Sequence, residues 1–145
     1  MLKDTFPNGR FAPPATEQQI EAVESTLQVR FPEQLRVLYR ECNGFREDRG
    51  NAKYLLSLTD EDFIGSLITL TRFHWRDLKE YWPQLDLSPY IFFGSSSADE
   101  MWGINWKGSA QIIAHHHDME DQFEIVGSNI IEVYKADYER YVEAS

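Results

Sequence analysis

The chain has almost no cysteine and no long apolar run. Cys42 is its single cysteine in 145 residues, so no disulfide can form within the chain. A membrane-spanning helix needs about 20 consecutive apolar residues, and no run approaches that length. The first residues, Met1 to Pro7, lack a basic segment followed by an apolar stretch, so no secretory signal is recognisable. We therefore expect a cytoplasmic protein in which Cys42 is a buried structural thiol.

Basic residues are also scarce. Lys and Arg total 14 against 24 Asp and Glu, which gives a formal net charge of −10. The imbalance is concentrated in residues 95–145, which hold ten acidic side chains and three basic ones. A negative field of this kind repels nucleic-acid phosphates and anionic lipids, and it attracts basic proteins. Direct binding to nucleic acid or to a membrane is therefore disfavoured, while solubility and recognition of a basic protein both remain open as reasons for the acidity.

The signatures of most catalytic sites are missing. Neither an HExxH helix nor cysteines at zinc-ligand spacing occurs. Residues 94–100 lack the lysine of a phosphate-binding loop, and no Gly-x-Ser-x-Gly motif surrounds their serines. We interpret this segment as a polar connection between strands, with partner contact as the alternative.

One histidine-rich run remains as a candidate for metal or acid–base chemistry, and it extends from His115 to Asp118. Consecutive residues of a strand point to opposite faces, so only His115 and His117 would converge, and the sequence marks no third ligand. We interpret the run as the end of a strand and a turn. A metal-dependent enzyme that uses His115 and His117 is kept as an alternative.

Two short helices are indicated early in the chain. Thr16 is a favoured N-cap, because its hydroxyl can accept a hydrogen bond from a free N–H of the first turn. Pro32 suits the first position of a second helix, and Asn43-Gly44 can form the left-handed turn that ends it. On the first helix, Glu24 can either bond a neighbouring turn or stay solvated. Apolar residues at helical spacing give each helix a buried face: Ile20, Val23 and Leu27, then Leu35, Leu38, Tyr39 and Cys42.

The remaining segments predict a sheet between helices. Residues 1–15 are rich in proline and turn signals and predict an irregular arm. Further along we expect a charged loop at 46–51, a short strand at 53–58, a capping box formed by Thr59 and Asp62, and a helix at 72–82 ended by Pro83. Short apolar or alternating runs then predict strands at 90–93, 101–106, 111–114 and 123–126, before a helix at 130–142. The whole predicts a single α+β domain over residues 1–145, with an N-terminal helical hairpin, a central mainly antiparallel sheet and a C-terminal helix.

The ordered set of motifs resembles the SUKH superfamily, which includes the Smi/Knr family of cell-wall-assembly regulators and bacterial toxin-immunity proteins. The N-terminal signature of that family is matched by Thr16, Ile20, Glu24, Phe31-Pro32, the 35–42 helix and Asn43-Gly44. Residues 90–94 and 102–105 resemble the family's next two strands, and residues 130–142 resemble its closing helix. Two positions depart from the pattern: Phe31 stands where leucine is usual, and Asn105 where aspartate is usual.

The resemblance implies a non-enzymatic protein that acts by protein–protein contact and needs no cofactor or metal. Many bacterial members are immunity proteins that neutralise a cognate toxin domain, and a regulatory scaffold that binds a housekeeping partner is the alternative. The acidity suits a basic toxin such as a nuclease, blocked sterically at its nucleic-acid groove. Trp102 and Trp106 share a strand face with Ile104, and they are either core residues or interface anchors. The predicted partner-binding residues come from the acidic second half: Asp99, Glu100, Trp102, Trp106, Asp118, Glu120, Asp121 and Glu124.

Overall fold

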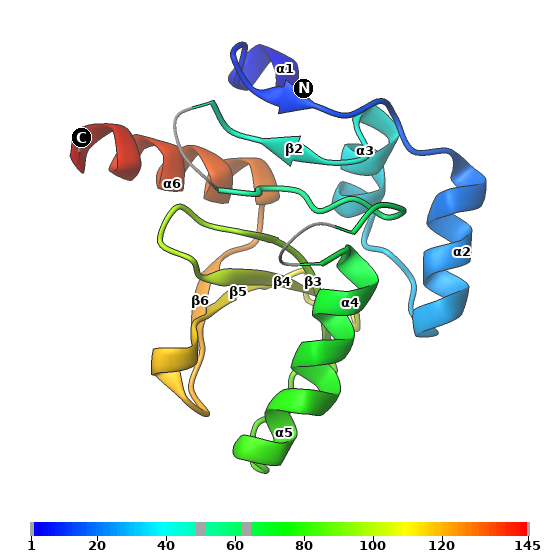
Figure 1. Cartoon of the computed structure of the whole chain (residues 1–145), viewed down its shortest axis with the longest axis vertical. Helices are drawn as coiled ribbons and strands as arrows, with labels where there is room; N and C mark the ends of the chain where they lie inside the picture. The colour runs from blue at the N-terminus through cyan, green and yellow to red at the C-terminus, as the bar shows by residue number, and fades with distance from the viewer. Residues whose placement is uncertain (1, 49–51, 62–64, 145) are drawn as a thin grey trace.

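The structure is a computed structural model that describes residues 2–48, 52–61 and 65–144. Figure 1 shows a central sheet with helices around it, and the N-terminal helix α1 lies at the same end of the molecule as the C-terminal helix α6. In chain order the elements are α1 (Leu2–Thr5), β1 (Arg10–Phe11), α2 (Glu17–Leu27), α3 (Glu33–Glu41), β2 (Phe45–Arg46), α4 (Leu67–Arg72), the π-helix η1 (Phe73–Asp77), α5 (Leu78–Tyr81), β3 (Tyr90–Ser95), β4 (Met101–Asn105), β5 (Ile112–His115), the 3-10 helix η2 (His117–Met119), β6 (Glu124–Gly127) and α6 (Ile130–Ala144). Among the described helices, none has the length and apolar character that crossing a bilayer requires.

The predicted helical hairpin is confirmed as α2 and α3. Thr16 Oγ1 accepts a hydrogen bond from Gln19 N at 3.1 Å, and Gln19 Oε1 accepts one from Thr16 N at 2.9 Å, so the two residues form a capping box. Pro32 lies one position earlier than expected, at the N-cap of α3. The left-handed residue after α3 is Gly44, whose φ is +128°, whereas Cys42 closes the helix in an extended conformation.

The four strands β3, β4, β5 and β6 form one antiparallel sheet in that order, which confirms the α+β class. The register shifts between Phe92 and Gly94, so β3 carries an irregularity at its end. A β-carbon at Gly94 would lie 2.0 Å from the carbonyl oxygen of Tyr54, far inside contact distance. Glycine is therefore required where the segment around Tyr54 passes over β3.

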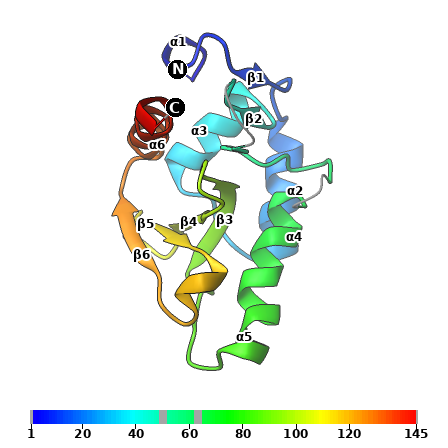
Figure 2. The same cartoon turned by 60° about the vertical axis from the view of Figure 1, so that its left-hand side comes forward.

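Helices cover both faces of this sheet (Figure 2). On one face, His74 of η1 stacks on Phe92 at a centroid distance of 3.8 Å, and Thr71 Oγ1 accepts a hydrogen bond from Phe92 N. On the other face, Tyr134 of α6 packs on Trp102 of β4 with the ring centroids 5.5 Å apart. The sheet is consequently the middle layer, with the α4–η1–α5 helix on one side and α6 on the other.

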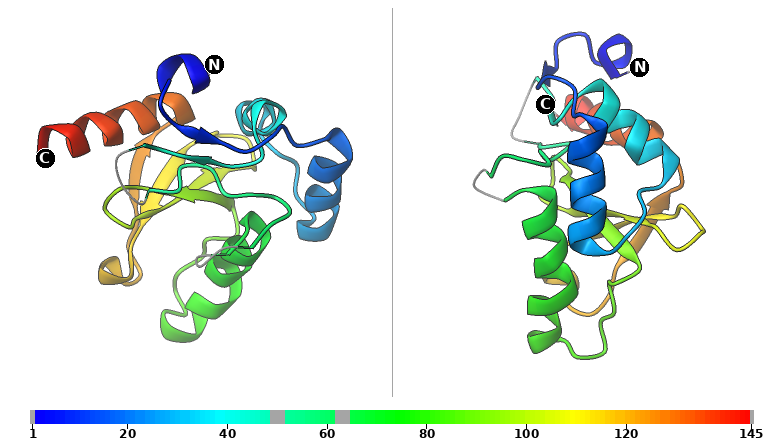
Figure 3. Two further views of the ribbon diagram at one scale, coloured as in Figure 1. Left: turned by 45° about the horizontal axis from the view of Figure 1, so that its top comes forward. Right: turned by 90° about the vertical axis from the view of Figure 1, so that its right-hand side faces the viewer.

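An aromatic cluster joins the N-terminal residues to the rest of the core. The arm over residues 1–15 was expected to be irregular, yet it contains α1, and both Leu2 and Phe6 are buried. Phe6 contacts Tyr138 of α6 at a centroid distance of 5.4 Å, and Phe11 stacks on Phe45 at 4.6 Å. Buried apolar side chains therefore give a defined structure to a segment whose prolines and turn signals predicted no regular structure. Figure 3 shows α1 and β1 lying against the β2 side of the molecule.

Three further expectations need correction or fall outside the described residues. Residues 53–58 form no regular strand, and only Leu55 makes an isolated bridge, to Phe45. The helix expected at 72–82 begins five residues earlier at Leu67, because Ser66 caps it. Within the expected capping box Asp62 lies outside the described residues, as do residues 49–51 of the charged loop.

Candidate partner-binding surface

Antiparallel pairing brings two acidic connections to the same end of the sheet. The β3–β4 connection and the β5–β6 connection both leave this end, since Met101 at the start of β4 pairs with His115 at the end of β5. Residues 96–100 and 116–124 are called the acidic loops below. They contain no Lys or Arg, and they hold six of the predicted binding residues: Asp99, Glu100, Asp118, Glu120, Asp121 and Glu124.

Local hydrogen bonds shape the loop over residues 116–124. Asp118 N donates to His116 Nδ1 at 3.2 Å and thereby starts the single turn of η2. The carbonyl oxygen of Glu120 accepts a hydrogen bond from His115 Nε2 at 2.9 Å, which ties the turn to the end of β5. Asp118, Glu120 and Glu124 are exposed, and Asp121 is half-buried. The carboxylates therefore face solvent on a turn that the histidines hold in shape.

The loop over residues 96–100 is held in place by a buried carboxylate of α6. Asp137 of α6 is 2% exposed, and its oxygens accept hydrogen bonds from Tyr54 Oη at 2.7 Å and from Ser97 N and Oγ, both at 3.1 Å. Ser96 Oγ accepts from Glu100 N at 3.1 Å and closes the loop. Burial and this carboxylate together raise the pKa of the Tyr54 hydroxyl far above its ordinary value, so Tyr54 remains a donor. These contacts leave Asp99 exposed at the tip, with a φ of +60°.

The two tryptophans of the predicted set do not join the acidic loops. Trp102 is 1% exposed and packs against both Tyr54 and Tyr134, so of the two interpretations the core position is the one that the structure shows. Trp106 is half-buried at the opposite end of β4, where its Nε1 donates to the carbonyl oxygen of Ser88 at 3.0 Å. Neither side chain can therefore act with the acidic loops as one surface.

The histidine run supplies a different group from the expected pair. His115 is buried and bonded to Glu120, whereas His117 is exposed on η2, so these two side chains do not form a shared ligand set. The three potential ligands that do lie near one another, within 4.8 Å, are His116, His117 and Asp118. They are consecutive and largely solvent-accessible, which is poor support for a catalytic metal centre.

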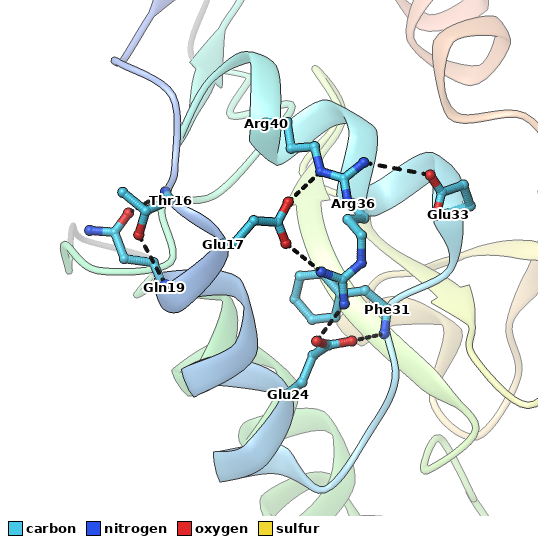
Figure 4. A network of polar contacts seen from close by, with 8 residues as sticks. All are labelled: Thr16, Glu17, Gln19, Glu24, Phe31, Glu33, Arg36 and Arg40. Carbon is cyan, nitrogen blue, oxygen red and sulfur yellow. Dashed lines mark hydrogen bonds and ion pairs between the residues drawn. The ribbon is translucent and has the colours of Figure 1, made fainter.

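A polar network holds the helical hairpin together, and Figure 4 shows it. Glu24 Oε2 accepts a hydrogen bond from Phe31 N at 2.7 Å, and Glu24 Oε1 accepts one from Arg36. Arg36 also pairs with Glu17 at 2.9 Å, and Glu17 in turn accepts a hydrogen bond from Arg40. Of the two interpretations offered for Glu24, bonding to a neighbouring turn is therefore correct. This carboxylate positions the α2–α3 connection and contributes nothing to the acidic loops.

Sequence reasoning missed two buried residues beneath the acidic loops, Asp137 and His74. Asp137 follows Tyr134 by three residues and so lies beside an apolar position of the C-terminal helix, but nothing local marks it as the anchor of a distant loop. His74 lies in the π-helix η1 and lines a cavity together with Asp99 and the other three histidines. A single histidine among helix formers carries no sequence signal for such a position.

The element order and the site together describe a SUKH-like α+β domain with an acidic loop surface. The model of the SMI1 / KNR4 family (SUKH-1) matches residues 14–134, and the chain belongs to this family. The match runs from the start of the helical hairpin into α6. The chain matches none of the curated proteins that were compared with it.

Proposed function

We propose that this chain is a non-enzymatic immunity protein that binds a basic toxin domain through the acidic loops. The observation that carries the proposal is uncompensated charge. Among the ion pairs of the described residues, the six carboxylates of the acidic loops pair with no Lys or Arg, and Asp118 pairs only with His116 and His117. A protein that needed only solubility would gain as much from dispersed charges as from six acids on two adjoining loops.

Electrostatic steering followed by steric blocking is the mechanism that this surface supports. Clustered charge of one sign raises the rate of encounter with an oppositely charged partner, and the effect weakens as salt increases. A nuclease or another nucleic-acid-binding toxin presents a basic groove of the required sign. A carboxylate surface seated in that groove excludes the substrate without any chemical step.

Family membership supports the same direction, since proteins of this family commonly bind other proteins. A regulatory scaffold that binds a housekeeping protein would use the same surface, so the nature of the partner separates the two functions. The metal-dependent enzyme is the weaker proposal, because His115 is buried with its Nε2 bonded to the carbonyl oxygen of Glu120, whereas His117 is exposed.

The test is capture of the partner by tagged wild-type protein from the native lysate, followed by identification of the co-eluting protein. A loop variant carries Asp118→Lys, Glu120→Lys and Asp121→Lys. A matched control carries Glu132→Lys, Glu139→Lys and Glu143→Lys on α6, which changes the net charge equally but outside the acidic loops.

We expect wild type and the control variant to retain a basic partner that the loop variant loses. We also expect expression of that partner alone to arrest growth and co-expression of this chain to restore it. A partner held equally by all three proteins would remove the acidic loops from the proposal. A partner that is harmless when expressed alone would replace the immunity function with the regulatory one.

A further inference from the structure

A cavity of about 420 Å³ lies directly beneath the acidic loops. Its apolar wall comes largely from the α4–η1–α5 helix, through Leu70, Phe73 and Leu78, and from Met101 of β4. Asp99 and His117 contribute from the two acidic loops. A concave apolar site with a few polar groups at defined positions is the usual form of a binding pocket.

All four histidines of the chain line this cavity. His74 is 2% exposed, and its ring is fixed by the stacking on Phe92 and by a 2.8 Å hydrogen bond from Nδ1 to the carbonyl oxygen of Leu70. Because a carbonyl oxygen can only accept, Nδ1 carries the proton and Nε2 is left as an acceptor. Burial lowers the pKa of His74 to about 4, so the ring stays neutral at pH 7.

His115 presents a second acceptor in the same way. In the neutral ring, the hydrogen bond that Nε2 donates to the carbonyl oxygen of Glu120 leaves Nδ1 as the acceptor, and the residue is 2% exposed. The rings of His74 and His115 stand nearly perpendicular, with their centroids 5.9 Å apart. Within the described part of the chain, the second nitrogen of each ring has no hydrogen-bond partner. Neither of these two nitrogens is sealed from solvent, so both can accept a hydrogen bond from a ligand that enters the cavity.

The helix that carries His74 is itself unusual. η1 is a π-helix in which Leu78 N donates to the carbonyl oxygen of Phe73, and such segments occur frequently at functional sites. Within this segment His74 packs against the sheet, while the neighbouring Phe73 is 42% exposed beside the cavity. The cavity is therefore built in part from an irregular helical segment.

We propose that this cavity receives an arginine side chain of the basic protein partner, an inference that rests on the protein-binding function proposed above. A guanidinium group has five N–H donors and is weakly hydrated, so it suits two imidazole acceptors and the Asp99 carboxylate. Its aliphatic stem lies against Leu70 and Met101. Asp99 is the one carboxylate among the described residues that line the cavity, and no Lys or Arg is among them, so charge complementarity favours a cation over an anion.

The test uses three short peptides as probes: acetyl-Trp-Arg-amide, acetyl-Trp-citrulline-amide and acetyl-Trp-Glu-amide. Citrulline keeps the shape of arginine and loses its charge. Binding is followed by two-dimensional amide NMR of the full chain, which gives both the affinity and the residues affected. Asp99→Asn keeps the left-handed backbone that asparagine adopts readily, and Asp60→Asn, on an exposed segment away from the cavity, is its matched control. His74→Phe keeps the stacking ring and removes the acceptor.

We expect the arginine peptide to bind about tenfold more tightly than the citrulline peptide, with shifts at Leu70, His74 and Met101. Asp99→Asn should abolish that preference, and Asp60→Asn should behave as wild type. His74→Phe should weaken binding of the arginine peptide, provided that its NMR spectrum is that of a folded protein. No shift at the cavity, or equal binding of all three peptides, would overturn the inference. Because the peptides need no natural partner, a failure here leaves the acidic loops untouched, and a failure of partner capture leaves a positive peptide result standing.

Discussion

Replacing Asp137 with alanine tests whether one buried carboxylate of α6 holds the loop at residues 96–100. The side chain accepts three hydrogen bonds, one from Tyr54 Oη and two from Ser97, and it is 2% exposed. Hydrogen bonds to a charged group contribute about 1.5–3 kcal/mol each to the free energy of unfolding, and such contributions are not additive. Ser97 is half-buried, so water can replace part of what it loses. We therefore expect Asp137→Ala to lower the free energy of unfolding by about 3–5 kcal/mol.

The assay is urea unfolding followed by tryptophan fluorescence, because Trp102 lies in the core beside Tyr54. Tyr54→Phe removes one of the three bonds and should cost about 1–2 kcal/mol. Glu139→Ala changes an exposed carboxylate on the same helix and should stay within about 0.5 kcal/mol of wild type. If Asp137→Ala lost no more than Glu139→Ala, the carboxylate would not anchor the loop, and the reasoning would fail.

Three further results are expected. Glu24→Ala should lower the free energy of unfolding by about 2 kcal/mol, and by more than Glu17→Ala does. The reason is that Glu24 is mostly buried and accepts a hydrogen bond from Phe31 N, whereas Glu17 is half-exposed. Equal losses of the two variants in urea titrations would contradict this. The free energy of unfolding should rise with pH between about 4 and 6.5, because burial lowers the pKa of His74 to about 4 and in this range the unfolded chain binds a proton that the folded chain does not. The expected rise is about 3 kcal/mol. A His74→Phe variant with the same pH profile would show that His74 is not the group responsible. Cys42 is buried, and burial raises the pKa of its thiol to about 12. A disulfide reagent at pH 8 should therefore modify Cys42 only as fast as the protein unfolds. Rapid labelling under native conditions would contradict this, because it would show that the thiol is accessible in the folded protein.

Much of the fold follows from local patterns. The capping residue Thr16 and the apolar spacing of the hairpin predict α2 and α3, and short apolar or alternating runs predict the strands of the sheet to within one or two residues. These signals are reliable because they depend on residues close in the sequence. The segment at 53–58 misled the same reasoning, since it is as apolar as a strand but is held by tertiary packing and scattered backbone bonds.

The site could be predicted only in part. Charge alone pointed to the carboxylates of both acidic loops, and antiparallel topology then places their loops at one end. Trp102 shows the limit of that reasoning: alternation identifies the face on which it lies, and only the packing of α6 decides that this face is buried. His74 of η1 and Asp137 of α6 approach the acidic loops from opposite faces of the sheet, and both belong to elements distant in the sequence. No local pattern encodes such contacts.

The central claim is that the acidic loops recognise a basic protein, and the association rate constant tests it most directly. It is measured by stopped-flow fluorescence with the captured partner, at low and high salt, for wild type, the variant carrying lysine at positions 118, 120 and 121, and the α6 control of equal charge. The account predicts a rate constant that falls with salt for wild type and the control, and one reduced about tenfold or more at low salt for the loop variant. Equal rate constants for the two variants would show that net charge alone steers the partner and would contradict the assignment of the binding surface to the acidic loops.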